Sequence, residues 1–271
     1  MAIITLLTDF GTQDEYVGAL KGVILTINPS ATLVDLTHHI APQDVRQAAY
    51  ILKSAYGYFP ERTIHLVVVD PGVGSRRRII AAGYSGHFFI APDNGLLPAL
   101  WAPEAPEELV SIENSALFLH PVSNTFQGRD VMAPAAANLS LGLTLDELGP
   151  ALSSRGLVVA ALPQPRLNSR GELEGEVVAV DGFGNLITNI QAHHLAGLTG
   201  GEMTRRLFID TGAAHIQGLT ECYSQAAAGT VLAVMGSRSC LEIAVNRGRA
   251  DQYLKIGKGA PVRVAFQKEG A

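Results

Sequence analysis

The sequence predicts an α/β protein with a helix-covered, mostly parallel sheet in an N-terminal domain and a smaller C-terminal β-barrel or sandwich domain. Strand and helix patterns alternate over the first half of the chain, which is typical of parallel sheets. In the second half, short strand patterns follow one another with turns and little helix between them. A polar, Pro-rich stretch at 163–171 is typical of a linker. We therefore expect domains at 1–162 and 172–271.

The composition is that of a core-rich globular protein. Hydrophobic residues make up 47% of the 271 residues and charged residues 17%, which excludes a disordered chain. A net charge of −5 gives no electrostatic surface for nucleic acid. There is no apolar run of membrane-spanning length and no signal-peptide pattern, so no membrane partner is expected. Cys222 and Cys240 form neither a disulfide framework nor a metal-ligand spacing, which fits core positions in a cytoplasmic protein.

Apolar periodicity defines the elements of the first domain. Residues 3–8 form a short apolar run typical of a strand, and residues 15–27 carry apolar side chains at helical spacing. Pro42 and Asp44 mark the start of a second helix. The expected elements are, in order, a strand at 3–8, a helix at 15–27, a strand at 32–36, a helix from 45 to about 58, strands at 65–69, 79–82, 87–91 and 109–112, and a helix at 131–141.

Two carboxylates bracket the loop between the first strand and the first helix. Asp9 follows the strand directly, and Asp14 lies near the start of the helix. Carboxylates at the carboxyl end of a strand can accept hydrogen bonds from ribose hydroxyls or an ammonium group. For Asp14, capping of the helix is the simpler interpretation. His38 and His39 follow the second strand, but adjacent strand residues point to opposite faces, so no metal site is expected.

The strand at 65–69 is the most informative stretch. Its apolar, β-branched residues are typical of a strand buried on both faces, and it ends on Asp70. Pro71-Gly72 then stop the strand, and three arginines follow at 76–78. Ligands of open α/β sheets bind at the carboxyl ends of the strands, which makes Asp70 and these arginines candidate functional residues. A solvated basic turn after the strand is the structural alternative.

The second domain is predicted from short apolar segments separated by turn residues. The first two expected strands flank the polar loop Asp181-Gly-Phe-Gly-Asn185. The expected strands are at 174–180, 186–190, 206–210, 230–235, 240–245 and 261–266.

Six motifs, in this order along the chain, resemble the S-adenosyl-L-methionine (SAM) hydroxide adenosyltransferase family. Members are also called SAM hydrolases, and fluorinase and chlorinase are their relatives. Any one motif is weak, but six in order are specific, and together they extend over nearly the whole chain. The motifs are TDFG at 8–11, VDPGVGSRR at 69–77, APDNGLL at 91–97, TFQGRD at 125–130, VDGFGNLITNI at 180–190 and SRSCLEIAVNRG at 237–248.

The resemblance implies an enzyme with SAM as its substrate and no cofactor. Water or hydroxide would attack C5′ of the ribose, with adenosine and L-methionine as products. The sulfonium needs no proton to leave, so catalysis reduces to positioning water and accepting the proton that it loses. The resemblance also implies a homotrimer, with active sites at the subunit interfaces, each between the first domain of one subunit and the second domain of its neighbour.

The resemblance implies binding roles for residues of both domains. Asp9 would hold the ribose hydroxyls, and Asp14 and Asp181 would lie near the methionine ammonium. Hydroxyl, backbone amide and guanidinium groups of the last motif would hold the methionine carboxylate, because they are good donors to a carboxylate. The other implied binding residues are Phe126 in the fourth motif, Ser237 and Arg238 for the carboxylate, and Phe183, Asn185 and Tyr223 around adenine.

The implied catalytic residues are Asp70, Arg77 and Gln127, and the third is a departure from the family. The family motif reads TFHGRD, with histidine where this chain has Gln127. Glutamine can donate to and accept from a water but cannot take up a proton near neutral pH. If the histidine acts as a base, Asp70 must act alone or the rate must fall; if it only positions water, Gln127 can replace it.

Two alternative functions remain open at the level of sequence. Gln127 is also consistent with a catalytically weakened SAM- or adenosine-binding protein. A halide-using 5′-halo-5′-deoxyadenosine synthase is the other alternative. The halogenating relatives, however, carry a different residue in place of Asp70, and fluorinase has serine where this chain has Gly128. Both positions favour hydroxide over halide.

Overall fold

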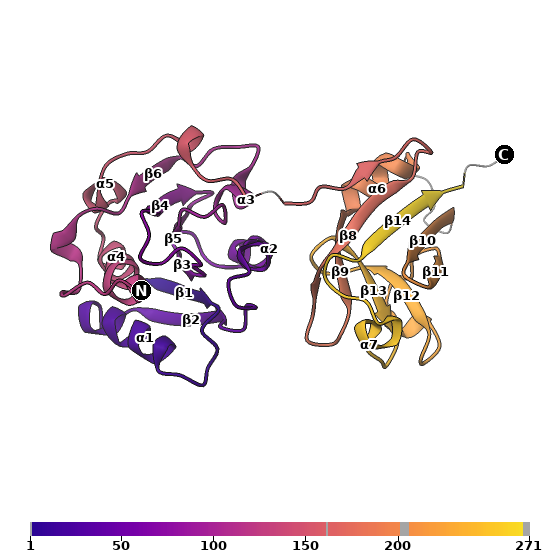
Figure 1. Cartoon of the computed structure of the whole chain (residues 1–271), viewed down its shortest axis with the longest axis horizontal. Helices are drawn as coiled ribbons and strands as arrows, with labels where there is room; N and C mark the ends of the chain where they lie inside the picture. Colours follow the sequence, from indigo (N-terminus) through magenta and orange to yellow (C-terminus); the bar gives the residue numbers. More distant parts are fainter. Residues whose placement is uncertain (1, 161, 201–205, 268–271) are drawn as a thin grey trace. The chain divides into compact units, whose positions relative to one another are not determined.

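A computed structural model describes residues 2–160, 162–200 and 206–267 and divides the chain into two compact units, 1–162 and 163–271 (Figure 1). The first unit contains a mixed sheet with helices on both faces, and the second contains an antiparallel, nearly closed sheet. The predicted fold class is confirmed. None of the described helices is both long and apolar enough to cross a membrane.

The first unit follows the predicted order of elements. Its predicted 45–58 helix is shorter than expected, because α2 ends at Ala55 and a 3₁₀ turn continues to Tyr58. The elements are β1 (Ile3–Thr8), α1 (Tyr16–Ile27), β2 (Thr32–Thr37), α2 (Val45–Ala55), β3 (Ile64–Val68), β4 (Ile79–Tyr84), β5 (His87–Pro92), α3 (Pro98–Trp101), β6 (Glu108–Ser111), a π-helical turn (Gly128–Met132), α4 (Ala133–Ser140) and α5 (Leu145–Leu148).

The sheet of the first unit has the strand order β2-β1-β3-β5-β4-β6. The strands β2, β1, β3 and β5 are parallel, and β4 and β6 add to one edge in antiparallel pairs. The parallel strands therefore end at one edge of the sheet. This edge is where an α/β sheet of this type binds its ligands.

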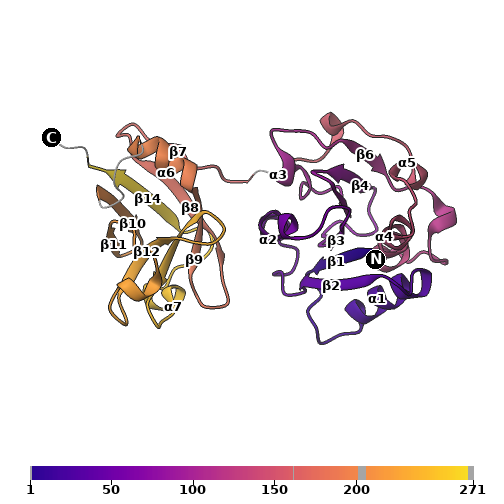
Figure 2. The same ribbon diagram turned by 180° about the vertical axis from the view of Figure 1, so that it is seen from behind.

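Alternation along each strand gives the sheet two separate cores. On β3, Leu66 and Val68 belong to the core beneath α1 and α4, whereas Val67 packs into the core beneath α2 and α3. Figure 2 shows α2 on the opposite side of the sheet from α1 and α4. Burial on both faces explains why β3 is apolar at every position except His65. Packing on both faces and pairing on both edges fix the position of its carboxyl end.

The second unit is a sheet of strand order β11-β10-β14-β8-β9-β13-β12, in which neighbouring strands are antiparallel. Within 163–171, expected to be a linker, Arg166–Leu167 form β7, which pairs with β8. The elements are β7 (Arg166–Leu167), β8 (Leu173–Val180), β9 (Leu186–Gln191), α6 (Ala192–Thr199), β10 (Leu207–Thr211), β11 (Ala214–Gln217), β12 (Val231–Met235), β13 (Cys240–Val245), α7 (Ala250–Leu254) and β14 (Pro261–Phe266).

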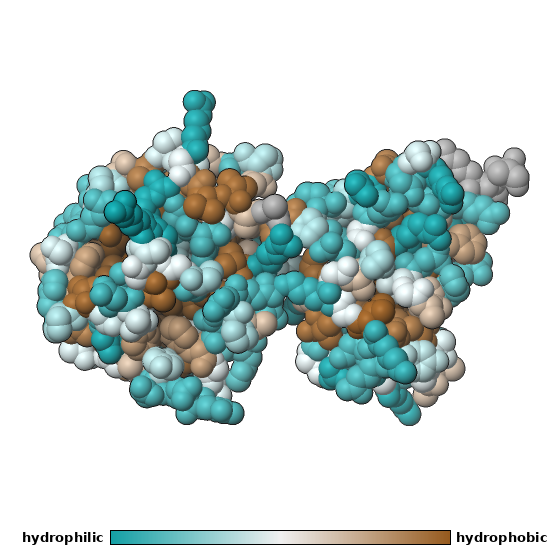
Figure 3. Space-filling model, in the orientation of Figure 1, coloured by the Kyte–Doolittle hydropathy of each residue, from teal (hydrophilic) through white to brown (hydrophobic). Residues whose placement is uncertain are grey.

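The surfaces of both units are mixed in character. Figure 3 shows hydrophilic residues over most of the visible face, with hydrophobic residues in separate patches. Cys240 is buried, but Cys222 is exposed, so the expectation of two core cysteines is wrong for Cys222. Cys222 lies in the irregular segment between β11 and β12, where no strand places its side chain in the core.

A buried histidine gives the first unit a testable pH dependence. The His65 side chain is fully buried, its Nδ1 lies 2.8 Å from Thr5 Oγ1, and its ring stacks on Phe89. Burial, and secondarily His87, lowers the pKa of His65 from 6.5 to about 3. Below pH 6.5 the unfolded chain binds a proton at this histidine that the folded chain does not bind. The free energy of unfolding therefore decreases as the pH is lowered from 6.5 to about 3.

We expect acidification from about pH 7 to about pH 5 to lower the free energy of unfolding by about 2 kcal/mol through His65 alone. Urea unfolding at the two pH values measures this loss. Between the same two pH values, the free energy of unfolding of the His65→Leu variant should decrease by about 2 kcal/mol less than that of the wild-type protein. An equal pH dependence in both proteins would contradict the assignment.

Candidate active site

Polar residues collect where the parallel strands of the first unit end. Asp9 follows β1 and Asp70 lies just beyond β3; the two strands are adjacent, and Thr8 pairs with Val68 in register. The edge is cross-linked by hydrogen bonds. Asn94 Nδ2 donates to the Val69 carbonyl over 2.8 Å. Asp9 and Asp70 therefore lie at the ends of neighbouring strands.

Asp70, Arg77 and Gln127 form one hydrogen-bonded group, called here the trio. Arg77 Nε donates to both oxygens of Asp70, at 2.9 and 2.8 Å, and Arg77 Nη2 also contacts Asp70 Oδ2. The same Nη2 donates to Gln127 Oε1 over 2.5 Å. The side chains of Asp70 and Arg77 are only 7% and 11% exposed. The structure thus brings the three predicted catalytic residues together in a largely desolvated position.

Two glycines allow the segments of the trio to approach each other. Gly74 has a φ of +78°, and a Cβ there would lie 2.5 Å from the Asn124 carbonyl oxygen, so glycine is required on both counts. Gly128 begins the π-helical turn, and a Cβ there would lie 2.7 Å from Val68 Cγ1. π-Helical turns are rare and frequent at functional sites. These close contacts hold Gln127 beside the end of β3.

Replacing Gly128 tests this packing. We expect Gly128→Ala to lower the free energy of unfolding by about 1–3 kcal/mol, because the stiff, β-branched Val68 cannot make room easily. Denaturant unfolding measures the change. Gly22→Ala is the matched control: no atom lies within 4 Å of a Cβ at this α1 position, so stability should rise by up to about 1 kcal/mol. Equal effects in the two variants would show that Gly128 is not tightly packed.

The three arginines after Gly74 have different environments. Arg76 is exposed, Arg77 belongs to the trio, and Arg78 pairs with Asp93 through Nε at 2.9 Å. Asp93 is 4% exposed and also accepts from the Val158 backbone N–H over 3.0 Å. The structural alternative of a solvated basic turn therefore describes Arg76, whereas Arg78 anchors a distant loop.

The three other predicted residues of the first unit, Asp9, Asp14 and Phe126, lie outside the trio and have different contacts. Asp9 Oδ2 accepts from the Gln43 backbone N–H over 2.8 Å. Asp14 is exposed and does not cap α1; Glu15 is the N-cap residue and caps through no side-chain bond. The capping interpretation of Asp14 is therefore wrong. The Phe126 ring packs edge-on against Phe10, with the ring centroids 5.7 Å apart, inside an aromatic cluster.

The predicted binding residues of the second unit line one cavity of about 630 Å³. They come from three segments that are far apart in sequence: the β8–β9 loop, the segment before β12 and the β12–β13 turn. These lining residues are Asp181, Phe183, Asn185, Tyr223, Ser237 and Arg238. The structure therefore brings together all of the residues that the resemblance assigns to this unit.

Asp181 organises one wall of this cavity. Its Oδ1 accepts from the backbone N–H groups of Phe183 and Asn185, each over 2.9 Å, and its Oδ2 accepts from Asn185 Nδ2 over 2.9 Å. These bonds fold 181–185 into a tight loop that leaves the Phe183 ring 80% exposed. An exposed aromatic ring at a cavity edge is well suited to stacking on a flat ligand.

Comparison with known proteins identifies the family. The model of the SAM hydroxide adenosyltransferase N-terminal domain matches residues 4–149, and the model of the C-terminal domain matches residues 175–263. The chain belongs to the SAM hydroxide adenosyltransferase family. The predicted resemblance is confirmed.

Named members of the family resemble the chain over nearly its full length. An (R)-S-adenosyl-L-methionine hydrolase of Thermus thermophilus is 38% identical, covering 97% of this chain and 100% of the relative. A fluorinase of an Actinoplanes species is 30% identical, covering 97% of each protein. The crystal structure of an uncharacterized conserved protein from Thermotoga maritima matches with a TM-score of 0.89 at 36% identity, covering 97% of this chain and 99% of that one.

Several lining residues of the cavity beside Asp181 were not assigned from the sequence, and Glu242 is the acidic one among them. Glu242 lies within the SRSCLEIAVNRG motif, on β13, and lines the same cavity as the predicted residues. It is 5% exposed, and burial raises the pKa of its carboxyl group. A lone acid inside the apolar run of a predicted strand is the signal that could have revealed it.

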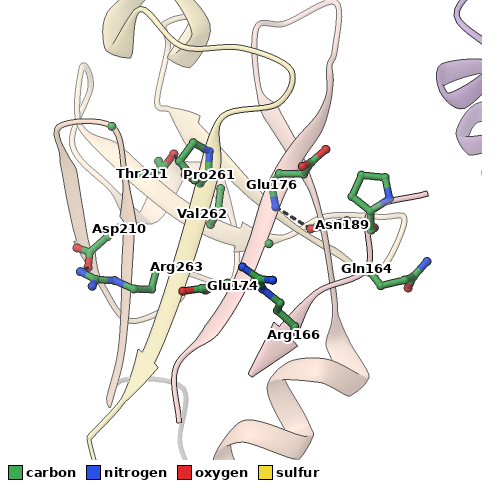
Figure 4. Close-up of a pocket in the computed structure, with 13 residues that line it drawn as sticks. Gln164, Arg166, Glu174, Glu176, Asn189, Asp210, Thr211, Pro261, Val262 and Arg263 are labelled. Atoms are coloured by element: carbon green, nitrogen blue, oxygen red, sulfur yellow. Dashed lines mark hydrogen bonds and ion pairs between the residues drawn. The ribbon is translucent and has the colours of Figure 1, made fainter. Parts of the chain in front are cut away.

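A second cavity, of about 620 Å³, lies in the same C-terminal domain (Figure 4). Two ion pairs lie in its lining: Arg263 Nη2 lies 2.6 Å from Asp210 Oδ2, and Arg166 Nε lies 3.2 Å from Glu174 Oε2. These groups are partly or largely solvent-exposed, so the pairs are typical of a surface ion-pair network. None of the predicted site residues lines this cavity. Across the described ranges, no cluster of three or more His, Cys, Asp or Glu side chains could hold a metal ion.

Proposed function

We propose that this protein hydrolyses SAM to adenosine and L-methionine. In this reaction a water oxygen forms a bond to C5′ of the ribose as the C5′–sulfur bond breaks. The electron pair of that bond stays on sulfur, which turns the sulfonium into the neutral thioether of methionine. The water loses one proton in the process. The enzyme must therefore align water with C5′ and accept that proton.

The observation that carries the proposal is the desolvated trio at the strand ends. Asp70 is a carboxylate fixed by Arg77, and it can accept a hydrogen bond, then the proton, from an adjacent water. Arg77 carries no acceptor and remains charged, so it cannot act as the base. We therefore assign the general-base role to Asp70 and the positioning of Asp70 and Gln127 to Arg77.

Gln127 is assigned a positioning role. Its Oε1 accepts from Arg77, so its amide group is oriented by the same guanidinium that holds Asp70. A neutral histidine ring could accept from Arg77 in the same way. The replacement therefore preserves the polarity of the trio and leaves proton transfer to Asp70.

We expect Gln127→His to change kcat by less than about tenfold. If the reaction needs a histidine at position 127 as its base, Gln127→His would instead raise kcat by about 10²- to 10⁴-fold. Steady-state kinetics of the two proteins separates these cases. A rise of the larger size would favour the alternative that the present chain is a weakened, ligand-binding member of the family.

The remaining site residues are assigned by substrate chemistry. Asp9 would bind the ribose diol, Asp14 and Asp181 the ammonium, and Ser237 with Arg238 the carboxylate. Phe183, Asn185 and Tyr223 would surround adenine. Phe126, which precedes Gln127 in the chain, is the remaining assigned binding residue. The proposal includes a homotrimer with active sites at the subunit interfaces, a cytoplasmic location and no cofactor.

Chromatography of SAM incubated with the purified protein tests the proposal. We expect adenosine and L-methionine in equal amounts, formed equally with and without chloride and after dialysis against a chelator. A 5′-chloro product that requires chloride would indicate a halide-using synthase. Absence of product, together with calorimetric binding of SAM or adenosine, would indicate a binding protein.

A further inference from the structure

Glu242 is a buried carboxylate in the cavity that the assigned roles leave unused. It occupies the middle of β13, paired with Val234 on β12 and Ile187 on β9. The side chain is 5% exposed, on a strand whose other residues are all buried. Burying a carboxylate is costly unless it is hydrogen-bonded, so the contacts of Glu242 indicate its role.

Glu242 contacts two separate walls of the cavity. Its Oε2 accepts from the hydroxyl of Tyr223 over 2.9 Å. Its Oε1 packs against Gly236, so closely that a Cβ at this glycine would lie 1.8 Å from the oxygen. Gly236 begins the β12–β13 turn, which is closed by the Ser239 N–H donating to the Gly236 carbonyl over 2.9 Å. The same turn carries Ser237 and Arg238.

The charges around Glu242 are consistent with a hydrogen bond from Tyr223 that connects these two walls through Glu242. Burial raises the pKa of Glu242, Asp181 raises it further, and Tyr223 and Arg238 oppose the rise. Burial and the Glu242 carboxylate raise the pKa of Tyr223 to about 12. The Tyr223 hydroxyl therefore keeps its proton at neutral pH and remains the donor in this hydrogen bond.

We propose that Glu242 is a positioning residue that holds Tyr223 and the turn at 236–239 in one arrangement and so sets the affinity of the cavity for the adenosyl and methionyl parts of the substrate. This inference rests on the proposed function. Glu242 acts through Tyr223, Ser237 and Arg238. Because the trio lies in the other unit, loss of Glu242 should weaken binding without altering the chemical step.

Kinetics of a double-mutant cycle tests the proposal. We expect Glu242→Ala to raise KM for SAM about tenfold, the effect of one hydrogen bond to a charged group, with kcat unchanged. Gly236→Ala should reproduce this effect, because its methyl group displaces the carboxylate. In the Glu242→Ala background, Gly236→Ala should add little further effect, since no carboxylate remains to be displaced.

Conservative and matched variants complete the test. Glu242→Gln keeps an oxygen that can accept from Tyr223 and should recover most of the lost affinity. Glu174→Ala removes a β8 carboxylate outside this cavity and should leave KM unchanged. Unchanged KM in Glu242→Ala, or additive effects of Glu242→Ala and Gly236→Ala, would overturn the proposal.

A readout without turnover separates this proposal from the function. If the wild-type protein forms no adenosine, the proposed function fails, and the same cycle is measured through the dissociation constant of adenosine by calorimetry. NMR titration of labelled tyrosines, with Tyr223→Phe for assignment, follows Tyr223 directly. We expect Glu242→Ala to lower the pKa of Tyr223. An unchanged pKa of Tyr223 would show that Glu242 does not hold the Tyr223 hydroxyl and would overturn the proposal.

Discussion

Asp70→Asn is expected to lower kcat for SAM hydrolysis by about 10²- to 10⁴-fold, the usual contribution of a general base. Asparagine has the shape of aspartate but cannot accept a proton. It also turns an N–H group toward Arg77, whose Nε and Nη2 both donate to the native carboxylate. Because the residue acts on water, KM for SAM should stay close to the wild-type value.

Steady-state kinetics measures this effect, with Asp146→Asn as the matched control. Asp146 is an exposed carboxylate in the first turn of α5, outside the trio. Its replacement should leave kcat unchanged. A fully active Asp70→Asn enzyme would show that water needs no base at this position, and the mechanism proposed for the trio would then be wrong.

Arg77→Met is expected to reduce both stability and activity. Asp70 and Arg77 are largely buried, and removing one partner of such a pair costs about 3–5 kcal/mol, because the remaining charge is left unpaired. Activity should also fall, since Asp70 and Gln127 both lose their common donor. Urea unfolding and steady-state kinetics measure the two effects separately.

Neighbouring variants distinguish the stability effect from the catalytic one. Arg76→Met removes an exposed arginine from the same loop and should change stability by no more than about 0.5 kcal/mol. The double variant Asp70→Asn, Arg77→Met leaves no unpaired charge, so it should regain stability relative to Arg77→Met while remaining inactive. A double variant no more stable than Arg77→Met would contradict a charge-pairing origin of the loss.

Strong hydrophobic patterns made the first unit predictable. The buried segment before Asp70 can be read as β3, because a strand buried on both faces is mostly apolar, and only His65 departs from that pattern. Short elements without such a pattern were missed, among them β11 (Ala214–Gln217) and α7 (Ala250–Leu254). The start of the predicted helix at 131–141 is a π-helical turn from Gly128, which lies close to Val68 of β3, and this tertiary contact cannot be read from the local sequence.

Many residues of the candidate site could be named from the sequence, but most of the contacts between them could not. Motif resemblance named the trio and part of the lining of the C-terminal cavity. The bond from Arg77 to Gln127 depends on the approach of two loops across Gly74, which spacing along the chain does not reveal. A lone acid in an apolar strand marks Glu242 as unusual, but its role follows only from its contacts with Tyr223 and Gly236, which the sequence does not show.

We propose that water, held by Asp70, Arg77 and Gln127, attacks C5′ of SAM. The most direct test is turnover in water labelled with the heavy isotope of oxygen, followed by mass spectrometry of both products. This mechanism predicts one labelled oxygen in each adenosine molecule, at the 5′ position, none in L-methionine, and almost no labelled adenosine from Asp70→Asn. Adenosine without the label, or equal labelling by Asp70→Asn, would contradict it.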